Sequence, residues 1–359
     1  MKFSIFHQIE SYDDSISYAQ LQEELKDLTV QAEAGGFDKV WIGEHHGMGF
    51  AASPNAFTSL AYIAAFTKTI RLGTGTSIAP FYHPIRLAGE IGQLDTMSNG
   101  RVDVGIARGA YNFEYERQYP GYANFEGETK NADVAWDAGQ RMRELVPAVQ
   151  KLLEGNYAHE GSIWSWPETT ATPWPVQKPY PPMYIAARDP NTHSFAVANN
   201  CNVQVTPLAL GDDECQNLME KFNGACAENP DKKRPEVMIL MHLYTAETED
   251  ELQEGAKNIS EFYHHFMKWF KNADGVNKVS KGHMEPITAA EREANPQYAP
   301  DVMRKNMIIG TPDEVIARLK KLEAMGYDEF SIWVDSHMNF EQKSKALKLF
   351  IDKVLPAFK

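Results

Sequence analysis

Cysteine is rare in this chain, with three residues among 359. Cys201, Cys215 and Cys226 are odd in number, and their spacing matches no zinc-binding motif. A disulfide framework and a structural zinc site are therefore both unexpected, and the sequence contains no HxH or HExxH pattern that would indicate another metal site. We expect reduced thiols in a cytoplasmic protein that binds no metal ion.

Basic residues are outnumbered by acidic ones, and no long apolar run is present. The chain has 35 Lys and Arg against 49 Asp and Glu, which gives a formal net charge of -14. Because nucleic acids and anionic membrane surfaces bind basic faces, neither is expected as a partner, although this charge is compatible with a local pocket for one phosphate. Phe57–Phe66 is largely apolar but too short to cross a bilayer. The first residues reach Glu10 after a short apolar run, which is unlike a signal peptide.

Strand and helix signals alternate along the chain. Ser17–Ala34 carries leucines at helical spacing, Pro84–Met97 begins with proline, and Thr311 precedes a helix with acidic residues in its first turn. Between helices lie short apolar segments without strict alternation, as expected of strands buried on both faces. The eight candidate strands are Phe3–His7, Lys39–Gly43, Ile70–Ile78, Val102–Ala107, Met183–Ala187, Asn202–Thr206, Glu236–Tyr244 and Glu329–Val334. This order predicts one α/β domain over residues 1–359, a (β/α)8 TIM barrel.

Two connections are longer than an ordinary loop. Asn112–Pro182 is an inserted segment with a helix near Val134–Leu153, followed by a stretch rich in Trp and Pro, Ile163–Pro182. Lys271–Met307 is polar and has little periodicity. Because long loops in compact domains are usually functional or disordered, we expect Lys271–Met307 to be a mobile lid loop, with disorder as the alternative.

The segment Glu44-His45-His46 directly follows the predicted strand Lys39–Gly43. Catalytic groups of a parallel barrel lie at the carboxyl ends of its strands. Because successive strand residues point to opposite faces, the two histidines are poorly placed to share one metal ion. We expect one imidazole to enter the pocket as a general acid or base, and a hydrogen-bonded structural histidine is the alternative.

Three further strands end in polar or glycine-rich sequence. Gly73-Thr74-Gly75-Thr76 lacks the third glycine of a dinucleotide fingerprint, and glycine within a strand is typical of close approach by a flat ligand. Arg108 beside Gly109 is suited to a phosphate, with a salt bridge to a neighbouring loop as the alternative. Arg188-Asp189, with Thr192 opening a helix, is either a second anion site or an ordinary N-cap.

Together these motifs resemble the bacterial luciferase-like flavin monooxygenases, over nearly the whole chain. The resemblance rests on the order and spacing of Glu44-His45-His46, Gly73-Thr74-Gly75-Thr76, His83-Pro84-Ile85-Arg86, Leu94-Asp95-Thr96-Met97-Ser98-Asn99-Gly100-Arg101, Arg108-Gly109-Ala110-Tyr111-Asn112 and Ile309-Gly310-Thr311-Pro312. It implies a (β/α)8 barrel that binds reduced FMN (FMNH2) from a separate NAD(P)H:flavin reductase. It also implies that O2 forms a flavin C4a-peroxide, which oxidises a small substrate such as an aldehyde, ketone or alkene.

The resemblance also implies roles for individual residues. His45, next to Glu44, corresponds to the catalytic histidine, and Gly75-Thr76 corresponds to a non-proline cis peptide beneath the flavin ring. Arg108 corresponds to the arginine that binds the phosphate, and Lys271–Met307 to a mobile lid. The residues implied in cofactor binding are Gly75, Thr76, Arg108, Gly109, Ala110, Tyr111, Ala187, Arg188, Asp189 and Thr192.

Some positions differ from luciferase. Ala107 stands where the luciferase α chain has a reactive cysteine, so light emission is not expected, and Arg188-Asp189 replaces a Glu-Ser pair in the phosphate loop. The helices Asn55–Phe66 and Pro84–Met97 lie where relatives dimerise, which implies a homodimer. Three other functions stay open: an F420-dependent dehydrogenase, a non-catalytic flavin-binding homologue, and a hydrolase based on a metal or carboxylates. Terpenes, cyclic ketones and thioethers also stay open as substrates.

Overall fold

Eight parallel strands close into a barrel in this computed structural model, which describes residues 1–119, 130–272 and 276–359. In order around the barrel they are β1 (Lys2–His7), β2 (Lys39–Ile42), β3 (Arg71–Ile78), β4 (Val102–Ala107), β7 (Met183–Ala186), β8 (Asn202–Val205), β9 (Val237–Thr245) and β13 (Glu329–Trp333). The parallel pairings of β8 with β9 and of β13 with β1 close the cylinder. All eight predicted strands are confirmed, because each boundary differs from its prediction by at most one residue.

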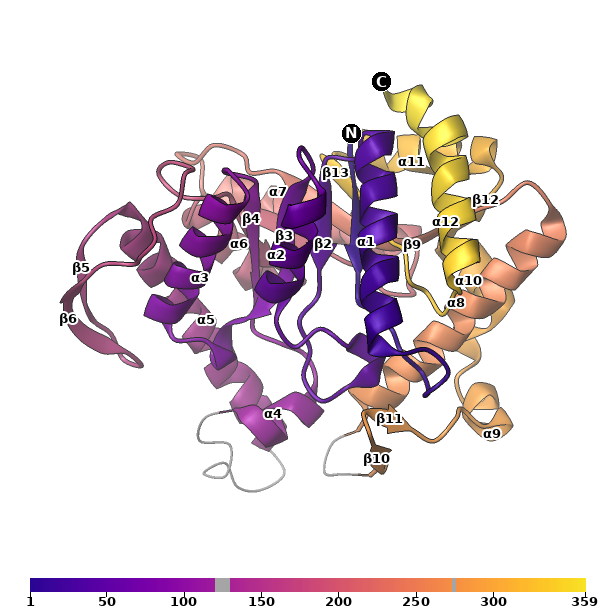
Figure 1. Ribbon diagram of the computed structural model, residues 1–359, viewed down its shortest axis with the longest axis horizontal. Helices are drawn as coiled ribbons and strands as arrows, with labels where there is room; N and C mark the ends of the chain where they lie inside the picture. The colour runs from indigo at the N-terminus through magenta and orange to yellow at the C-terminus, as the bar shows by residue number, and fades with distance from the viewer. Residues whose placement is uncertain (120–129, 273–275) are drawn as a thin grey trace.

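Helices surround the barrel on its outside (Figure 1). They are α1 (Tyr18–Gly35), α2 (Ala56–Phe66), α3 (Pro84–Met97), α5 (Lys130–Glu154), α6 (Pro190–Ala198), α7 (Asp212–Glu228), α8 (Glu249–Phe270), α11 (Pro312–Met325) and α12 (Phe340–Leu349). Local signals set their ends: the Ser17 side chain caps α1, and Gly36 ends it at a φ of 90°. None of the helices in the described ranges is both long and apolar enough to cross a membrane.

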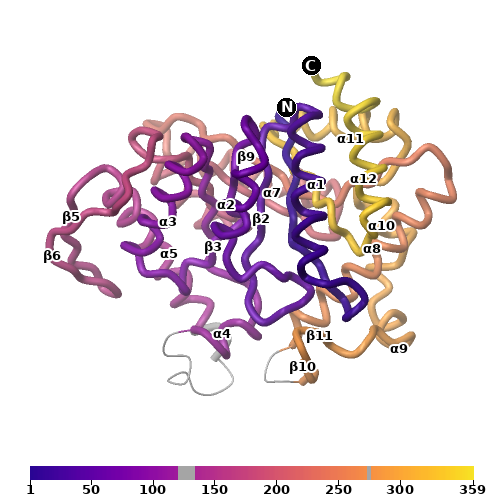
Figure 2. Tube along the Cα trace, in the orientation of Figure 1, coloured from indigo at the N-terminus to yellow at the C-terminus, as the bar shows by residue number. Residues whose placement is uncertain are grey.

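The two chain termini lie together at the end of the barrel where the strands begin (Figure 2). The short helix α4 (Asn112–Gln118) and the hairpin of β10 (Val279–Ser280) and β11 (His283–Met284) lie at the opposite end. That end holds the carboxyl ends of the strands, which is where a barrel of this kind carries its site.

Besides the β10–β11 hairpin, two small strand pairings were not predicted. Within the inserted segment Asn112–Pro182, β5 (Tyr157–Glu160) and β6 (Ser165–Thr169) form an antiparallel hairpin that projects from the side of the barrel (Figure 1). β12 (Ile308–Gly310) adds to the last residues of β9, outside the ring of eight strands. These strands have three to five residues, which is too short for a periodic pattern to be recognised.

The segment Lys271–Met307 contains more regular structure than its sequence indicates. Besides the β10–β11 hairpin, it holds α9 (Ala289–Glu293) and α10 (Pro300–Asn306). A capping box formed by Thr288 and Glu291 begins α9, and Lys268 forms a salt bridge with Glu291 at 2.9 Å. Local capping and charge, rather than apolar periodicity, organise this segment. The alternative of disorder is therefore wrong for residues 276–307, and the mobile lid stays a prediction.

A buried charge network lies inside the barrel near the amino ends of the strands. The carboxylate of Glu329 accepts hydrogen bonds from Lys39 at 2.5 Å, Ser4 at 2.6 Å and Trp41 at 2.8 Å. Burial alone would lower the pKa of Lys39, but the combined attraction of the surrounding acidic groups, with Glu329 first and Asp103 and Asp38 also contributing, outweighs it and raises that pKa. The network ties β1, β2 and β13 together.

We expect Lys39→Met to destabilise the barrel strongly. It would leave Glu329 buried without its cationic partner, which should lower the free energy of unfolding by about 3–5 kcal/mol. Denaturant titration measures this change. The matched control is Lys2→Met, because Lys2 pairs with Glu236 on the surface and its loss should cost less than about 1 kcal/mol. Equal losses in the two variants would contradict a structural role for the buried pair.

Candidate active site

The predicted polar segments gather at one mouth of the barrel. β2, β3, β4 and β7 are consecutive neighbours and run parallel, so their carboxyl ends meet at the same end. The segments that lie there are those around His45, Thr76, Arg108 and Arg188. α4 and the β10–β11 hairpin border this mouth in Figure 1.

The middle of β3 departs from regular strand geometry. The peptide bond between Gly75 and Thr76 is cis, as the resemblance implies. The pairing of β3 with β4 shifts register between Thr74 and Ser77, which leaves the two residues between them outside the regular ladder. A Cβ on Gly75 would lie 3.2 Å from the Phe6 ring, so glycine suits this close approach. Gly75 and Thr76 stay partly exposed at the mouth.

His45 is held by a carboxylate that the sequence analysis missed. Its Nδ1 lies 3.2 Å from Oε2 of Glu114, and the backbone N–H of His46 donates to Oε1 of Glu114 at 2.8 Å. Because carboxylate oxygens accept hydrogen bonds, Nδ1 carries the proton and Nε2 of neutral His45 keeps its lone pair. Glu114 is buried in α4, whereas the His45 side chain is 20% exposed. The pair can therefore present a fixed proton acceptor at the mouth.

Glu44 and His46 form a separate pair. The carboxylate of Glu44 lies 3.1 Å from Nε2 of His46 and accepts a hydrogen bond from the Tyr82 hydroxyl at 2.5 Å. Burial raises the pKa of Glu44, and the hydrogen bonds from His46 and Tyr82 only partly oppose it. The His46 ring packs edge-on against Phe81. The two histidines thus have different surroundings, as their adjacent positions predict.

The ring of Tyr111 packs against the imidazole of His45. The ring of Tyr111 is perpendicular to that of His45, with centroids 5.0 Å apart, and Tyr111 is buried. Gly109, just before it, has a φ of 94°, which a side chain would strain. Ala110 is exposed. The loop after β4 therefore places one aromatic ring inside and one small side chain outside.

Arg108 is exposed at the mouth, and no described residue neutralises it. Its guanidinium donates to the backbone oxygen of Ala135 at 3.3 Å, and no carboxylate among the described residues forms a salt bridge with it. The salt bridge considered as an alternative is thus not found in residues 1–119, 130–272 or 276–359. The Tyr115 hydroxyl donates to the Arg108 carbonyl at 2.7 Å and holds the loop. The arrangement can present a cation to an anionic ligand.

The charged side chains of the loop after β7 already bond to other residues of the protein. Asp189 is the N-cap of α6, because its carboxylate accepts from Thr192 N at 3.0 Å and from the Thr192 hydroxyl at 2.6 Å. Burial opposes ionisation of Asp189, but these hydrogen bonds outweigh it and lower its pKa, with a further contribution from Arg108. Arg188 forms a salt bridge with Glu214 at 2.8 Å, and Ala187 is buried. The N-cap alternative describes Asp189 well, and ligand contact here stays a prediction.

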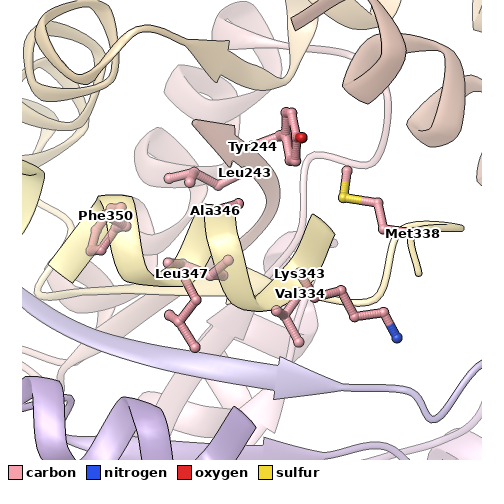
Figure 3. Close-up of a pocket in the computed structure, with 9 residues that line it drawn as sticks. Leu243, Tyr244, Val334, Met338, Lys343, Ala346, Leu347 and Phe350 are labelled. Carbon is pink, nitrogen blue, oxygen red and sulfur yellow. The ribbon is translucent and has the colours of Figure 1, made fainter. Parts of the chain in front are cut away.

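The pocket drawn in Figure 3 lies elsewhere, between α12 and the strands β9 and β13. Its lining is mostly apolar, with Leu243, Val334 and Leu347 among the contributors, and its one charged residue, Lys343, donates to Asp335 at 3.0 Å. Within the described ranges, no group of three or more His, Cys, Asp or Glu residues is placed to hold a metal ion. The mouth therefore stays the candidate site.

Comparison with known proteins points to one family. The model of the luciferase-like monooxygenase family matches residues 1–329. The oxygenase component of flavin-dependent trigonelline monooxygenase from Acinetobacter baylyi is 49% identical over 358 residues, which cover 100% of this chain and 96% of that protein.

Solved structures share the fold. Monooxygenase RslO1 from Streptomyces bottropensis has a TM-score of 0.80 and 25% identity, with 100% of both chains covered. The oxygenating constituent of 3,6-diketocamphane monooxygenase from Pseudomonas putida, in complex with FMN, has a TM-score of 0.72 at 18% identity, with 99% of this chain and 98% of that chain covered. These likenesses confirm the predicted (β/α)8 barrel.

Glu114→Gln should reverse the tautomer of His45. The amide oxygen of glutamine would still accept from the His46 N–H, so its NH2 group would face Nδ1 of His45 and donate to it. The proton of the neutral imidazole should then move to Nε2, which nitrogen-15 NMR of histidine-labelled protein detects. Glu116→Gln, on the same helix, serves as the control. A proton that stays on Nδ1 in Glu114→Gln would show that Glu114 does not set the tautomer.

Proposed function

The chain belongs to the luciferase-like monooxygenase family, and on this basis we propose that it is the oxygenase component of a flavin-dependent monooxygenase. One atom of O2 enters a small organic substrate, the other leaves as water, and reduced flavin is oxidised. The observation that carries the proposal is the His45–Glu114 pair, at the same mouth as the cis Gly75–Thr76 peptide and Arg108. A separate reductase would supply the reduced flavin, in keeping with the "oxygenase component" of the Acinetobacter relative.

The residues at the mouth fit FMN. Arg108 is exposed and, among the described residues, without a carboxylate partner, so its guanidinium can bind a phosphate. Gly75 and Thr76 are partly exposed at the mouth, where a flat ring could lie against their backbone. The other residues proposed to contact the cofactor are Gly109, Ala110, Tyr111, Ala187, Arg188, Asp189 and Thr192. Bound reduced FMN would supply the electrons that activate O2.

His45 is the residue proposed to hold or move a proton. Glu114 accepts from Nδ1, so Nε2 is the nitrogen that can take a proton from a bound molecule and return it. Tyr111 covers the imidazole and limits its contact with water. Glu44 accepts a hydrogen bond from the Tyr82 hydroxyl. We therefore propose that Glu44 supports the carboxyl end of β2 and does not contact the reacting atoms.

The proposed substrate is an N-methylated pyridine carboxylate of the trigonelline type. The support is the 49% identity, over the whole chain, to a protein named for trigonelline. Aldehydes, ketones and alkenes, which the resemblance implies, are the alternatives. Trigonelline differs from them in that its ring carries a permanent positive charge.

Residues 1–359 are proposed to act as one domain, and two copies are proposed to pair through α2 and α3. Phe66 on α2 is 48% exposed and Met97 on α3 is 59% exposed. Large apolar side chains exposed on neighbouring helices are suited to cover one another in a dimer. Lys271–Met307 is proposed to act as a lid.

The reaction is tested with oxygen-18 gas, reduced FMN and trigonelline. We expect mass spectrometry to find one labelled oxygen atom in each product molecule, because a monooxygenase inserts one atom of O2. A reaction without protein is the control, since reduced FMN also oxidises by itself. Substrate oxidation that needs F420 and no O2 would support a dehydrogenase. Flavin binding with no labelled product from trigonelline or an aldehyde would indicate a non-catalytic flavin-binding protein.

Two substitutions should separate cofactor binding from turnover. Arg108→Ala should raise the dissociation constant of reduced FMN by about 10-fold to 100-fold, because hydrogen bonds to charged groups contribute about 1.5–3 kcal/mol. His45→Ala should lower kcat by about 100-fold and change that constant by less than about threefold, as expected of a proton-transfer group. Anaerobic titration and steady-state kinetics measure the two quantities. Arg86→Ala, which removes a surface pair with Glu90, is the control. Unchanged FMN affinity would exclude the role of Arg108, and unchanged kcat that of His45.

A further inference from the structure

A row of aromatic side chains runs along α8 and meets the barrel mouth. Phe262, Phe266 and Phe270 recur every four residues, which places them on one side of the helix. The ring centroids are 6.2 Å apart from Phe262 to Phe266 and 6.0 Å apart from Phe266 to Phe270. Tyr111 lies 6.0 Å from Phe266, and Trp333 lies 4.9 Å from Phe262. We call these five rings the aromatic wall.

The exposure of the aromatic wall increases along α8. Phe262 is fully buried, Phe266 is partly buried, and Phe270 is 44% exposed. A row that only packed the core would be covered along its whole length, whereas this one leads from the barrel interior to the surface. Phe266, in the middle of the row, lies beside Tyr111, and the ring of Tyr111 contacts that of His45. The aromatic wall therefore extends from the buried Phe262 to the surface at Phe270 and contacts the ring of His45 through Tyr111.

Three buried carboxylates lie at the same mouth. Glu10, Glu44 and Glu114 are each almost inaccessible, and none of them forms a salt bridge with a lysine or arginine among the described residues. Burial raises the pKa of Glu10 and of Glu44, and the negative charge of Asp335 adds to the effect on Glu10. In the described part of the chain these carboxyl groups therefore have no lysine or arginine in direct contact, although Lys343 is near enough to Glu10 to oppose part of the rise in its pKa, which reaches about 7.

Glu10 is the carboxylate directly attached to the aromatic wall. It accepts a hydrogen bond from the indole N–H of Trp333 at 3.3 Å, from the Tyr12 hydroxyl at 2.5 Å and from the backbone N–H of His337 at 2.9 Å. Its charge also reaches Tyr111: burial raises the pKa of that phenol, and Glu114 and Glu10 raise it further. Trp333 and Tyr111, the two rings of the wall that are not on α8, therefore both lie near a carboxylate.

A bound cation would stabilise the ionised form of these buried carboxyl groups. Buried charge without a counter-charge is costly, and a cation near it recovers part of that cost. Aromatic faces attract cations as well, more strongly when water is excluded. In the described part of the chain, the cation–ring contacts of lysine and arginine involve other rings than the five of the wall. None of the five rings is therefore paired with a lysine or arginine of the described residues. Trp333 stacks on His242 with ring centroids 4.6 Å apart, and Phe262 is fully buried. Phe266 and Phe270 are therefore the rings of the wall with a surface open to a ligand.

We propose that the aromatic wall binds a flat aromatic ring with a permanent positive charge, and that Glu10 is its counter-charge. This inference rests on the proposed function, since it states what holds the substrate of that reaction. An N-alkylated pyridinium ring has a flat face for the wall and no N–H group that needs an acceptor. A neutral apolar substrate would gain from the rings but would leave Glu10 uncompensated.

The test is a calorimetric titration of the full-length protein, with and without FMN and without reductant, so that no turnover occurs. The probes are trigonelline, N-methylpyridinium and nicotinate, whose ring nitrogen is neutral at mildly alkaline pH. We expect trigonelline to bind at least about tenfold more tightly than nicotinate, and N-methylpyridinium to bind detectably without any carboxylate. Equal affinity for trigonelline and nicotinate would overturn the proposal.

Substitutions test which side chains bind the cationic ring. Glu10→Gln keeps the shape and hydrogen-bonding capacity of the side chain, and it should weaken trigonelline binding by about tenfold through the lost charge. Asp14→Asn removes an exposed carboxylate of the same loop and should leave binding unchanged. Phe266→Leu should weaken binding by about fivefold, and Phe266→Tyr should restore most of it. Unchanged affinity in Glu10→Gln, or equal affinities in the two Phe266 variants, would contradict the proposed site.

The binding test and the oxygen test can fail separately. If Glu10→Gln does not fold, as judged by its thermal unfolding and near-ultraviolet circular dichroism, the Phe266 variants decide the outcome. A clear preference for the cationic ring without oxygen incorporation would keep the binding site and reject the proposed reaction. Oxygen incorporation into neutral substrates, with no preference for the cation, would keep the reaction and reject the binding site.

Discussion

Closure of the parallel barrel is the constraint on which the candidate site depends. Because β8 pairs with β9 and β13 pairs with β1, every barrel strand points its carboxyl end toward one mouth. His45 and Glu114 are 69 positions apart in sequence, yet closure brings them within hydrogen-bonding distance. At the other end, the Lys39–Glu329 pair links β2 to β13 inside the cylinder. The site is therefore a property of the whole ring of strands.

Buried carboxylates near the two ends of the barrel have different partners, although Asp335 at the mouth also pairs with the buried Lys343 at 3.0 Å. Near the amino ends, Glu329 has a buried lysine partner, Lys39, and two further hydrogen-bond donors. At the mouth, Glu10 and Glu114 are held by neutral donors and by a histidine. A buried carboxylate that is satisfied by hydrogen bonds but lacks a cation in the described structure is typical of a functional site rather than of a stabilising one. This difference supports the assignment of chemistry to the mouth.

His45 and Arg108 could be predicted because each follows a recognisable strand and belongs to a short motif. Glu114 could not, because α4 has seven residues, no clear periodicity, and a contact to His45 that depends on tertiary structure. The phenylalanine spacing of α8 is visible in the sequence, but the same spacing describes a helix packed on a core. The exposure of Phe270 separates the two interpretations, and exposure is known only from the fold.

A carboxylate beside a proposed phosphate site would ordinarily weaken it, and Asp189 is such a carboxylate. Both of its oxygens accept hydrogen bonds from Thr192, so its negative charge interacts with the N-terminus of α6. The neighbouring Arg188 is engaged by Glu214. Arg108 has no such salt bridge within the described residues and also lowers the pKa of Asp189, which places its charge near that loop. Binding of a phosphate at the proposed cofactor site would therefore depend mainly on Arg108.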